Sequence, residues 1–261
     1  MKLILTIALL FLIGCSGNGK KENVNMPGVY RMISQSIKGG NIDTTYRSLA
    51  QLKIFTSDHL MFANVNQAGT VGSFGIGTYT VNGDTIIENI FLRGSDSTKT
   101  ETPAEYKLII VKTGKGYQQV IPDFTSNGQK YVLSEDYESV GMPAKSTLDG
   151  VWKLSLSYHI KGNDTTTNNI TQYKMYDGGY FIWGQSRPDT ARKNITAVGF
   201  GKFTLEGNKL QEYLMESTNA EIRSLDVHID IEMKGDTVFK QTISNKDSTR
   251  DVETYVRVTK E

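Results

Sequence analysis

The chain has 261 residues, of which 38% are hydrophobic, and its 29 basic and 28 acidic side chains give a formal net charge of +1. Binding to nucleic acid needs a concentrated basic surface, and no segment is rich in Lys or Arg, so we expect no nucleic-acid partner. The length is ample for one or two domains with hydrophobic cores.

The N-terminus has the pattern of an export signal. Lys2 precedes an apolar run from Leu3 to Ile13 that only Thr6 interrupts. This run is roughly half of the 20 or so residues that a membrane-spanning helix needs. We therefore expect residues 1–14 to be a signal peptide that is removed.

The segment Leu12-Ile13-Gly14-Cys15 resembles the bacterial lipobox. The resemblance implies cleavage before Cys15 and lipid attachment to its thiol, with palmitate-type acyl chains that anchor the protein to a membrane of the cell envelope. An ordinary secretory signal that happens to contain a cysteine is the alternative. In lipoproteins of this kind a non-acidic residue such as Ser16 favours the outer membrane.

Residues 15–26 are polar and rich in Gly and Asn, which predicts a flexible lipidated tether. Cys15 is the only cysteine in the chain. Disulfides therefore cannot stabilise the exported part, and hydrophobic cores must do so.

The rest of the chain contains an internal repeat. Residues 51–63 read QLKIFTSDHLMFA and residues 172–184 read QYKMYDGGYFIWG, which places Lys53 opposite Lys174. The similarity continues on both sides, where residues 28–32 match 150–154, 75–84 match 199–208, Gln119 matches Gln241, and 131–132 match 255–256. We interpret the chain as a duplication with repeats over residues 27–144 and 145–261.

Each repeat has a hydrophobic period of two, most clearly in residues 227–233, which indicates half-buried antiparallel strands. Turn sequences such as Asn82-Gly83-Asp84 and Lys234-Gly235-Asp236 separate the strands, of which the second repeat has about eight. Closure into an up-and-down barrel hides the edges of such strands. We predict an all-β protein with two tandem antiparallel barrels; an open sandwich is the alternative.

The second repeat opens with Gly150-Val151-Trp152, and Arg257 on its last strand is flanked by valines. These features are similar to the calycins, the superfamily of lipocalins and fatty-acid-binding proteins. The resemblance implies lipocalin-like barrels in which Trp152 plugs the bottom and Arg257 packs over its ring. More broadly, the chain resembles two-domain lipocalin-like lipoproteins common in Bacteroidota, which implies a fold and a location more than an activity.

Two finer expectations follow from these motifs. Alternation places Trp152 on one inward face with Leu154, Leu156 and Tyr158. In the first repeat Tyr30 replaces the tryptophan. When the two repeats are aligned, Leu133 occupies the position of Arg257.

No residue pattern indicates catalysis, a metal site or a cofactor, and we expect none. His228 alternates with apolar residues, His159 is expected on the face opposite Trp152, and His59 lies at a hairpin, so all three are interpreted as solvated or edge residues. Gly75-x-Gly77 and Gly199-x-Gly201 lack a following helix, and we expect bends at barrel corners there rather than phosphate binding.

Aromatic residues crowd one hairpin of the second repeat and occupy both of its faces. Either one face fills the barrel and the other packs on the first repeat, or the aromatic side chains line a ligand site. The candidate ligand-lining or core residues are Trp152, Tyr173, Tyr176, Tyr180, Phe181, Trp183 and Arg257.

Two functional hypotheses result. The first is a non-catalytic, membrane-anchored module in which a barrel binds a small apolar or amphipathic ligand. The alternative is an interaction or scaffold lipoprotein with solid-filled barrels, whose partner is an envelope protein.

Overall fold

The computed structural model describes residues 23–47, 50–95, 98–126, 128–142, 145–189 and 193–259. The predicted signal peptide, Cys15 and Ser16 lie outside the described residues. Every regular element in the described part is a β-strand. In that part, no helical segment has the length and apolar character needed to cross a bilayer.

The first repeat forms a closed antiparallel barrel. Its ring runs β1-β3-β4-β5-β6-β8-β9-β10 and closes by pairing β10 with β1, while the short strands β2 and β7 extend β1 and β6. The strands are β1 (Gly28–Gly39), β2 (Ile42–Arg47), β3 (Ala50–Phe55), β4 (His59–Val65), β5 (Gly72–Asn82), β6 (Thr85–Ser95), β7 (Thr98–Thr100), β8 (Ala104–Lys112), β9 (Gly116–Ser126) and β10 (Gln129–Ser139).

The second repeat forms a matching barrel. Its ring runs β11-β13-β14-β15-β16-β17-β18-β19 and closes by pairing β19 with β11, with β12 as an extension of β11. The strands are β11 (Gly150–Lys161), β12 (Asp164–Thr167), β13 (Thr171–Asp177), β14 (Tyr180–Asp189), β15 (Lys193–Glu206), β16 (Lys209–Ser217), β17 (Asp226–Lys234), β18 (Val238–Ser244) and β19 (Arg250–Arg257).

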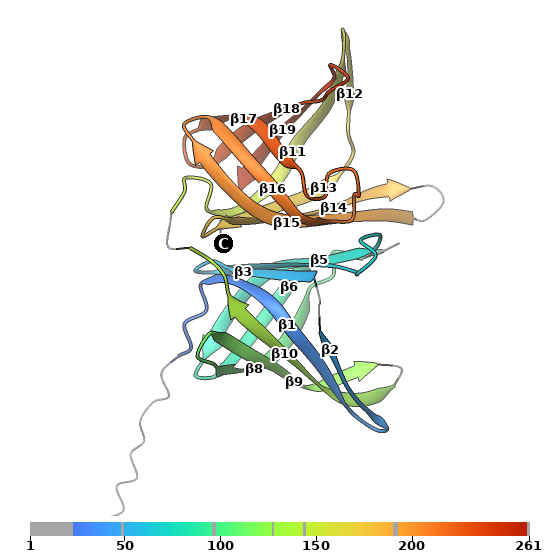
Figure 1. The fold of residues 1–261 in the computed structure, drawn as a ribbon, viewed down its shortest axis with the longest axis vertical. Coiled ribbons are helices and arrows are strands. Elements are labelled where there is room, and N and C mark those ends of the chain that lie inside the picture. Colours follow the sequence, from blue (N-terminus) through green and yellow to red (C-terminus); the bar gives the residue numbers. More distant parts are fainter. Residues whose placement is uncertain are drawn as a thin grey trace, which may run out of the picture.

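The predicted fold class is therefore confirmed, with eight ring strands in each barrel. Because both rings are closed by hydrogen bonds between first and last strands, the open sandwich is excluded. The barrels lie one above the other in Figure 1, with β3 and β5 of the first facing β13, β14 and β15 of the second.

The two barrels share an apolar core between their outer faces. One cluster of buried side chains joins Ile54, Met61 and Phe74 of the first barrel to Met175 and Ile182 of the second. These strands therefore carry apolar residues on both faces, one for the barrel interior and one for the partner barrel.

The glycines at residues 77 and 201 sit at β-bulges, where the register shifts. A Cβ atom on Gly201 would lie 1.8 Å from the backbone oxygen of Tyr213, and one on Gly77 would lie 2.1 Å from that of Asn89. The expectation that glycine permits a bend there is confirmed, because only a residue without a side chain allows this approach.

A bulge in β11 changes which residues face inward. The register shifts between Leu154 and Leu156, after which Ser157 is 3% exposed and Leu156 is 40% exposed. The expected inward face for Leu156 and Tyr158 is wrong, because the extra residue inverts the alternation beyond Leu154.

The closing strands also correct the alignment of the repeats. Trp152 pairs with Arg257, whereas Tyr30 pairs with Ser139 and Leu133 pairs with Ile37. The expected alignment of Leu133 with Arg257 is therefore wrong. Ser139 is the residue of the first barrel that corresponds to Arg257. By register, Tyr137 and not Tyr131 corresponds to Tyr255.

Candidate functional site

A buried polar network lies inside the second barrel. Lys174 on β13 is 4% exposed, and its Nζ donates to Oε1 and Oε2 of Glu212 on β16 at 2.9 and 3.2 Å. The same ammonium donates to Oε1 of Gln241 on β18 at 3.3 Å. Burying this ammonium is tolerable because a carboxylate and an amide oxygen replace its water.

A second carboxylate, Glu253 on β19, completes the network. Its Oε2 accepts hydrogen bonds from Nε2 of Gln241 at 2.7 Å and from the Tyr255 hydroxyl at 2.6 Å. Gln172 donates to the Tyr255 hydroxyl, and the Tyr176 hydroxyl donates to Glu212 at 2.5 Å. The network therefore holds one cation and two carboxylates, linked by neutral donors.

The first barrel repeats this arrangement strand by strand. Lys53 donates to Glu88 at 2.6 Å and to Gln119 at 3.0 Å. Gln119 and Tyr137 each donate to Oε2 of Glu135 at 2.9 Å. Both copies of the duplication thus keep the same interior chemistry.

Burial governs the protonation of these groups. Desolvation raises the pKa of Glu253, and the nearby Lys174 ammonium only partly opposes this effect. Desolvation and the neighbouring carboxylates raise the pKa values of Tyr176 and Tyr255 well above the ordinary phenol value. The two phenols therefore keep their protons and act as fixed hydrogen-bond donors.

A cavity lies against the network in each barrel, and the two cavities differ in size. The cavity of the second barrel has a volume of about 290 Å³, whereas that of the first has about 140 Å³. Small-molecule sites usually have at least about 300 Å³. The second cavity is close to that size, whereas the first is well below it.

Smaller side chains open the second cavity. On β17, Val227 pairs with Glu212, whereas in the first barrel Tyr106 pairs with Glu88. The hydroxyl of Tyr106 accepts a hydrogen bond from Nη1 of Arg93 at 2.6 Å, and this pair occupies the first interior.

The position of Arg93 is held by a serine in the second barrel. Arg93 pairs with Gly75, and Ser217 pairs with the matching Gly199. The second barrel thus has Ser217 in place of Arg93 and Val227 in place of Tyr106, so both members of the hydrogen-bonded pair are replaced. Asn219 and Ile222, from the connection between β16 and β17, complete the wall of the second cavity.

The predicted plug at the bottom of the second barrel is confirmed. The guanidinium carbon of Arg257 lies 4.1 Å from the centroid of the fully buried Trp152 ring. Arg257 also donates to the backbone oxygens of Asp149, Asp236 and Thr147 at 2.5, 2.6 and 2.9 Å. Arg257 and Trp152 thus close the end of the barrel instead of lining the cavity.

The aromatic hairpin is divided between two environments. Tyr173 and Tyr180 belong to the core between the barrels, and Tyr176 and Phe181 belong to the interior core of the second barrel. Of the sequence candidates only Trp183 lines the cavity. The packing interpretation accounts for the others.

The histidines take three different positions. His59 begins β4 at the β3–β4 hairpin, but it is 3% exposed beside Asp58, so it is buried and not solvated. His159 lies beyond the bulge of β11 and shares a face with Ser157, so its expected face is also wrong, although its side chain is 40% exposed beside Asp251. His228 is exposed on the outer face of β17.

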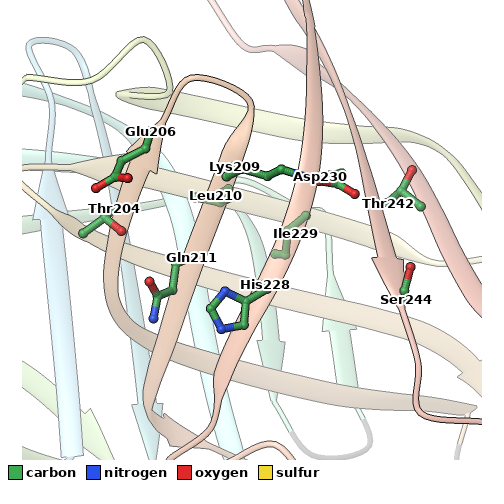
Figure 2. Close-up of a pocket in the computed structure, with 10 residues that line it drawn as sticks. All are labelled: Thr204, Glu206, Lys209, Leu210, Gln211, His228, Ile229, Asp230, Thr242 and Ser244. Carbon is green, nitrogen blue, oxygen red and sulfur yellow. Dashed lines mark hydrogen bonds and ion pairs between the residues drawn. The ribbon is translucent and has the colours of Figure 1, made fainter.

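Further hollows lie outside the two barrel cavities, one of them between β1, β3, β15 and β16 and lined by Arg31, Phe200 and Tyr213. Two others lie elsewhere. Figure 2 shows one on β15–β18, where Gln211 and His228 come from neighbouring strands and the ion pair of Lys209 with Asp230 is exposed. The other lies where the barrels meet and includes His59 and Arg257. Neither is lined by the buried network. In the described ranges, no group of three or more His, Cys, Asp or Glu side chains is placed to hold a metal ion.

Sequence reasoning missed the residues that build this site. Lys174 and Gln241 match Lys53 and Gln119, and each recurs among apolar neighbours on a strand. A charged side chain kept at a buried position in both repeats was the available signal. Glu212 and Glu253 carried no such signal, because their pairing with Lys174 and Gln241 depends on the barrel closing.

No family model and no curated protein sequence matches the chain. Two solved structures of transferrin binding protein B from Haemophilus parasuis Hp5, one a single and one a double mutant, are similar over 92% of this chain. They are 8% identical, with 78% and 77% of their own chains covered and TM-scores of 0.25 and 0.27. At these values the matches carry no argument about function.

Proposed function

We propose that this protein is a lipid-anchored, non-catalytic module of the cell envelope whose second barrel binds a small amphipathic molecule. The observation that supports binding is the cavity of about 290 Å³, in which apolar walls meet a buried polar network. The first barrel has the same network, but its cavity has only about 140 Å³, and Tyr106, hydrogen-bonded to Arg93, stands where the second barrel has Val227. The first barrel therefore serves as a comparison within the same chain, because it has the same polar network and a smaller cavity.

The ligand has an apolar part and a polar part because the walls have both. Trp183, Leu214 and Val227 provide the apolar part of the lining, and Lys174, Glu212 and Glu253 provide its charges. The two kinds of side chain alternate across the wall, because Lys174 pairs with Trp183 and Glu212 pairs with Val227 on neighbouring strands. A purely apolar ligand would cover these charges without replacing their hydrogen bonds, which is unfavourable.

The test uses the full chain purified from its own host. Native mass spectrometry should detect a bound small molecule, and an amphipathic fluorescent dye should compete for the same site. Val227→Tyr copies the first barrel and should abolish binding because the ring fills the cavity. Val111→Tyr makes the same change at an exposed position of β8 and should leave binding intact. Binding that survives Val227→Tyr, or the absence of any bound mass and any dye binding, would refute the proposal.

The anchor is tested separately at Cys15. Cys15→Ser should leave an unprocessed precursor that incorporates no labelled palmitate, because the serine hydroxyl does not replace the thiol in lipid transfer. Metabolic labelling and the mass of the product check this. Fractionation of the two membranes of the envelope tests the expected outer-membrane location. A processed, labelled Cys15→Ser product would contradict the assignment.

A second role is favoured for the first barrel. Its cavity of about 140 Å³ is small, and its outer face packs on the second barrel, so it supports interaction or positioning better than ligand capture. Crosslinking in the native envelope should recover a protein partner attached to the first barrel. A chain that is always found alone would argue against this role.

A further inference from the structure

The second carboxylate of the network has different partners in the two barrels. In the first barrel Glu135 accepts three hydrogen bonds, two on Oε2 and one on Oε1 from Nε2 of Gln35 at 2.9 Å. In the second barrel Glu253 accepts two hydrogen bonds, both on Oε2. No described residue donates to Oε1 of Glu253.

One substitution between the repeats explains the difference. Gln35 pairs with Glu135 across β1 and β10, and Ser157 holds the corresponding position opposite Glu253. The Ser157 hydroxyl accepts a hydrogen bond from Asn168 at 3.0 Å, and among the described residues no hydrogen bond joins it to Glu253. The second barrel has therefore lost the amide donor that satisfies this oxygen in the first, and Glu253 lines the larger cavity instead.

No described cation forms an ion pair with Glu253, although the Lys174 ammonium lies nearby. The Lys174 ammonium is shared between both oxygens of Glu212 and the amide oxygen of Gln241. The remaining acidic group in the wall, Asp251, already accepts from Asn245 and contacts His159. Negative charge thus exceeds positive charge around the cavity, and an unpaired carboxylate in such a place is costly.

We propose that the ligand of the second barrel carries a cationic amine, which takes the place of the Gln35 amide and donates to Oε1 of Glu253. The apolar body of the ligand then lies against Trp183, Leu214 and Ile243, which line the same cavity. This inference rests on the proposed function and specifies the chemical class of the ligand.

The test compares three size-matched probes on the full chain by isothermal titration calorimetry. The probes are 2-phenylethylamine, 2-phenylethanol and 3-phenylpropionate, which share an apolar ring and differ in the charge of the head. The amine should bind about 10- to 100-fold more tightly than the alcohol, the ratio expected for one hydrogen bond to a charged group. The carboxylate should bind least well because Glu253 and Asp251 repel it.

Three variants locate the effect. Glu253→Gln should remove the preference for the amine, and thermal unfolding should show that it is folded. Ser157→Gln restores the donor of the first barrel and should weaken amine binding by occupying Oε1. Glu232→Gln, an identical change at an exposed position of β17, should behave as the wild type.

The outcomes separate the two proposals. If the alcohol or the carboxylate binds as tightly as the amine and Val227→Tyr blocks that binding, the cavity binds ligands and the cationic class is wrong. An amine preference that persists in Glu253→Gln also overturns the inference. If no probe binds, the cavity does not accept amphipathic molecules of this size, and the proposed function falls as well.

Discussion

At the scale of residues, Arg257 shows how one side chain can close a barrel. It covers the Trp152 ring and donates to three backbone oxygens from two different connections, residues 147–149 and 236. A planar guanidinium can satisfy these directions together, whereas an ammonium cannot.

We expect Arg257→Lys to lower the free energy of unfolding by about 1–3 kcal/mol, since backbone acceptors lose donors and the ring loses its cover. Urea denaturation measures the change. Arg250→Lys on the same strand is exposed and should be nearly neutral. Equal effects of the two substitutions would show that the contacts of Arg257 contribute little.

Glu253 gives a prediction about pH. Its pKa in the folded protein is raised by burial above the ordinary value of 4.5. The folded state therefore holds the proton more tightly than the unfolded state, and this contribution to stability is complete below the ordinary value and is lost as pH rises through the raised one.

Glu253→Gln keeps the acceptor but cannot ionise. The variant should therefore become more stable than the wild type as pH rises from about 4 to about 8, with little difference at the acidic end. Thermal unfolding at several pH values tests this. A difference that does not change with pH would mean that Glu253 titrates in the same way in the folded and unfolded chain.

At the scale of elements, the bulges decide which residues meet. Gly201 brings β15 so close to β16 that a Cβ atom would lie 1.8 Å from the oxygen of Tyr213. The bulge in β11 places Ser157, and not Leu156, inside the barrel. Such single-residue shifts set the register of each strand that follows.

Gly201→Ala should therefore destabilise the protein by about 2–4 kcal/mol, because backbone must move to admit the methyl group. Gly114 lies in open space, and Gly114→Ala should change stability little. Chemical denaturation of both variants makes the comparison. A mild effect of Gly201→Ala would indicate that the bulge can relax.

Local sequence patterns predicted most of the strands and hairpins, but few of the contacts between side chains on different strands. The alternation of residues 227–233 and the turns around Gly83 and Gly235 match the observed β17, β5–β6 and β17–β18 hairpins. The inward side of Ser157 was missed because a bulge leaves no mark in the alternation of the sequence. The cavity was missed because its width depends on Val227 and Ser217, which come from neighbouring strands.

At the scale of the whole molecule, the barrels are joined by side chains rather than by the linker alone. Phe74 belongs to the apolar core between the barrels, and a Cβ atom on Gly184 of β14 would lie 2.4 Å from its ring. Phe91 and Tyr173 also meet across this interface, with ring centroids 6.0 Å apart.

Gly184→Val should force the two barrels apart at this contact. We expect calorimetry to resolve two unfolding transitions in the variant where the wild type has one, because the barrels lose their coupling. The double variant Gly184→Val with Phe74→Leu should recover part of the single transition by making room. A single transition at the wild-type temperature for Gly184→Val would show that the interface adapts.

The duplication, the all-β class and about eight strands in the second repeat could be predicted from the sequence alone. The contact of Trp152 with Arg257 was implied by the resemblance to the calycins. The fold class and the strands follow from periodicity and turn chemistry, which act over a few residues, and the duplication follows from the similarity of the two halves. Three outcomes required the folded barrels. Lys174 meets Glu212 and Gln241. Ser139 stands opposite Tyr30 where Arg257 stands opposite Trp152. The cavity of the second barrel is about twice as large as that of the first. Those outcomes depend on the register between strands distant in the chain, because cross-strand neighbours and the space between them exist only once each barrel has closed.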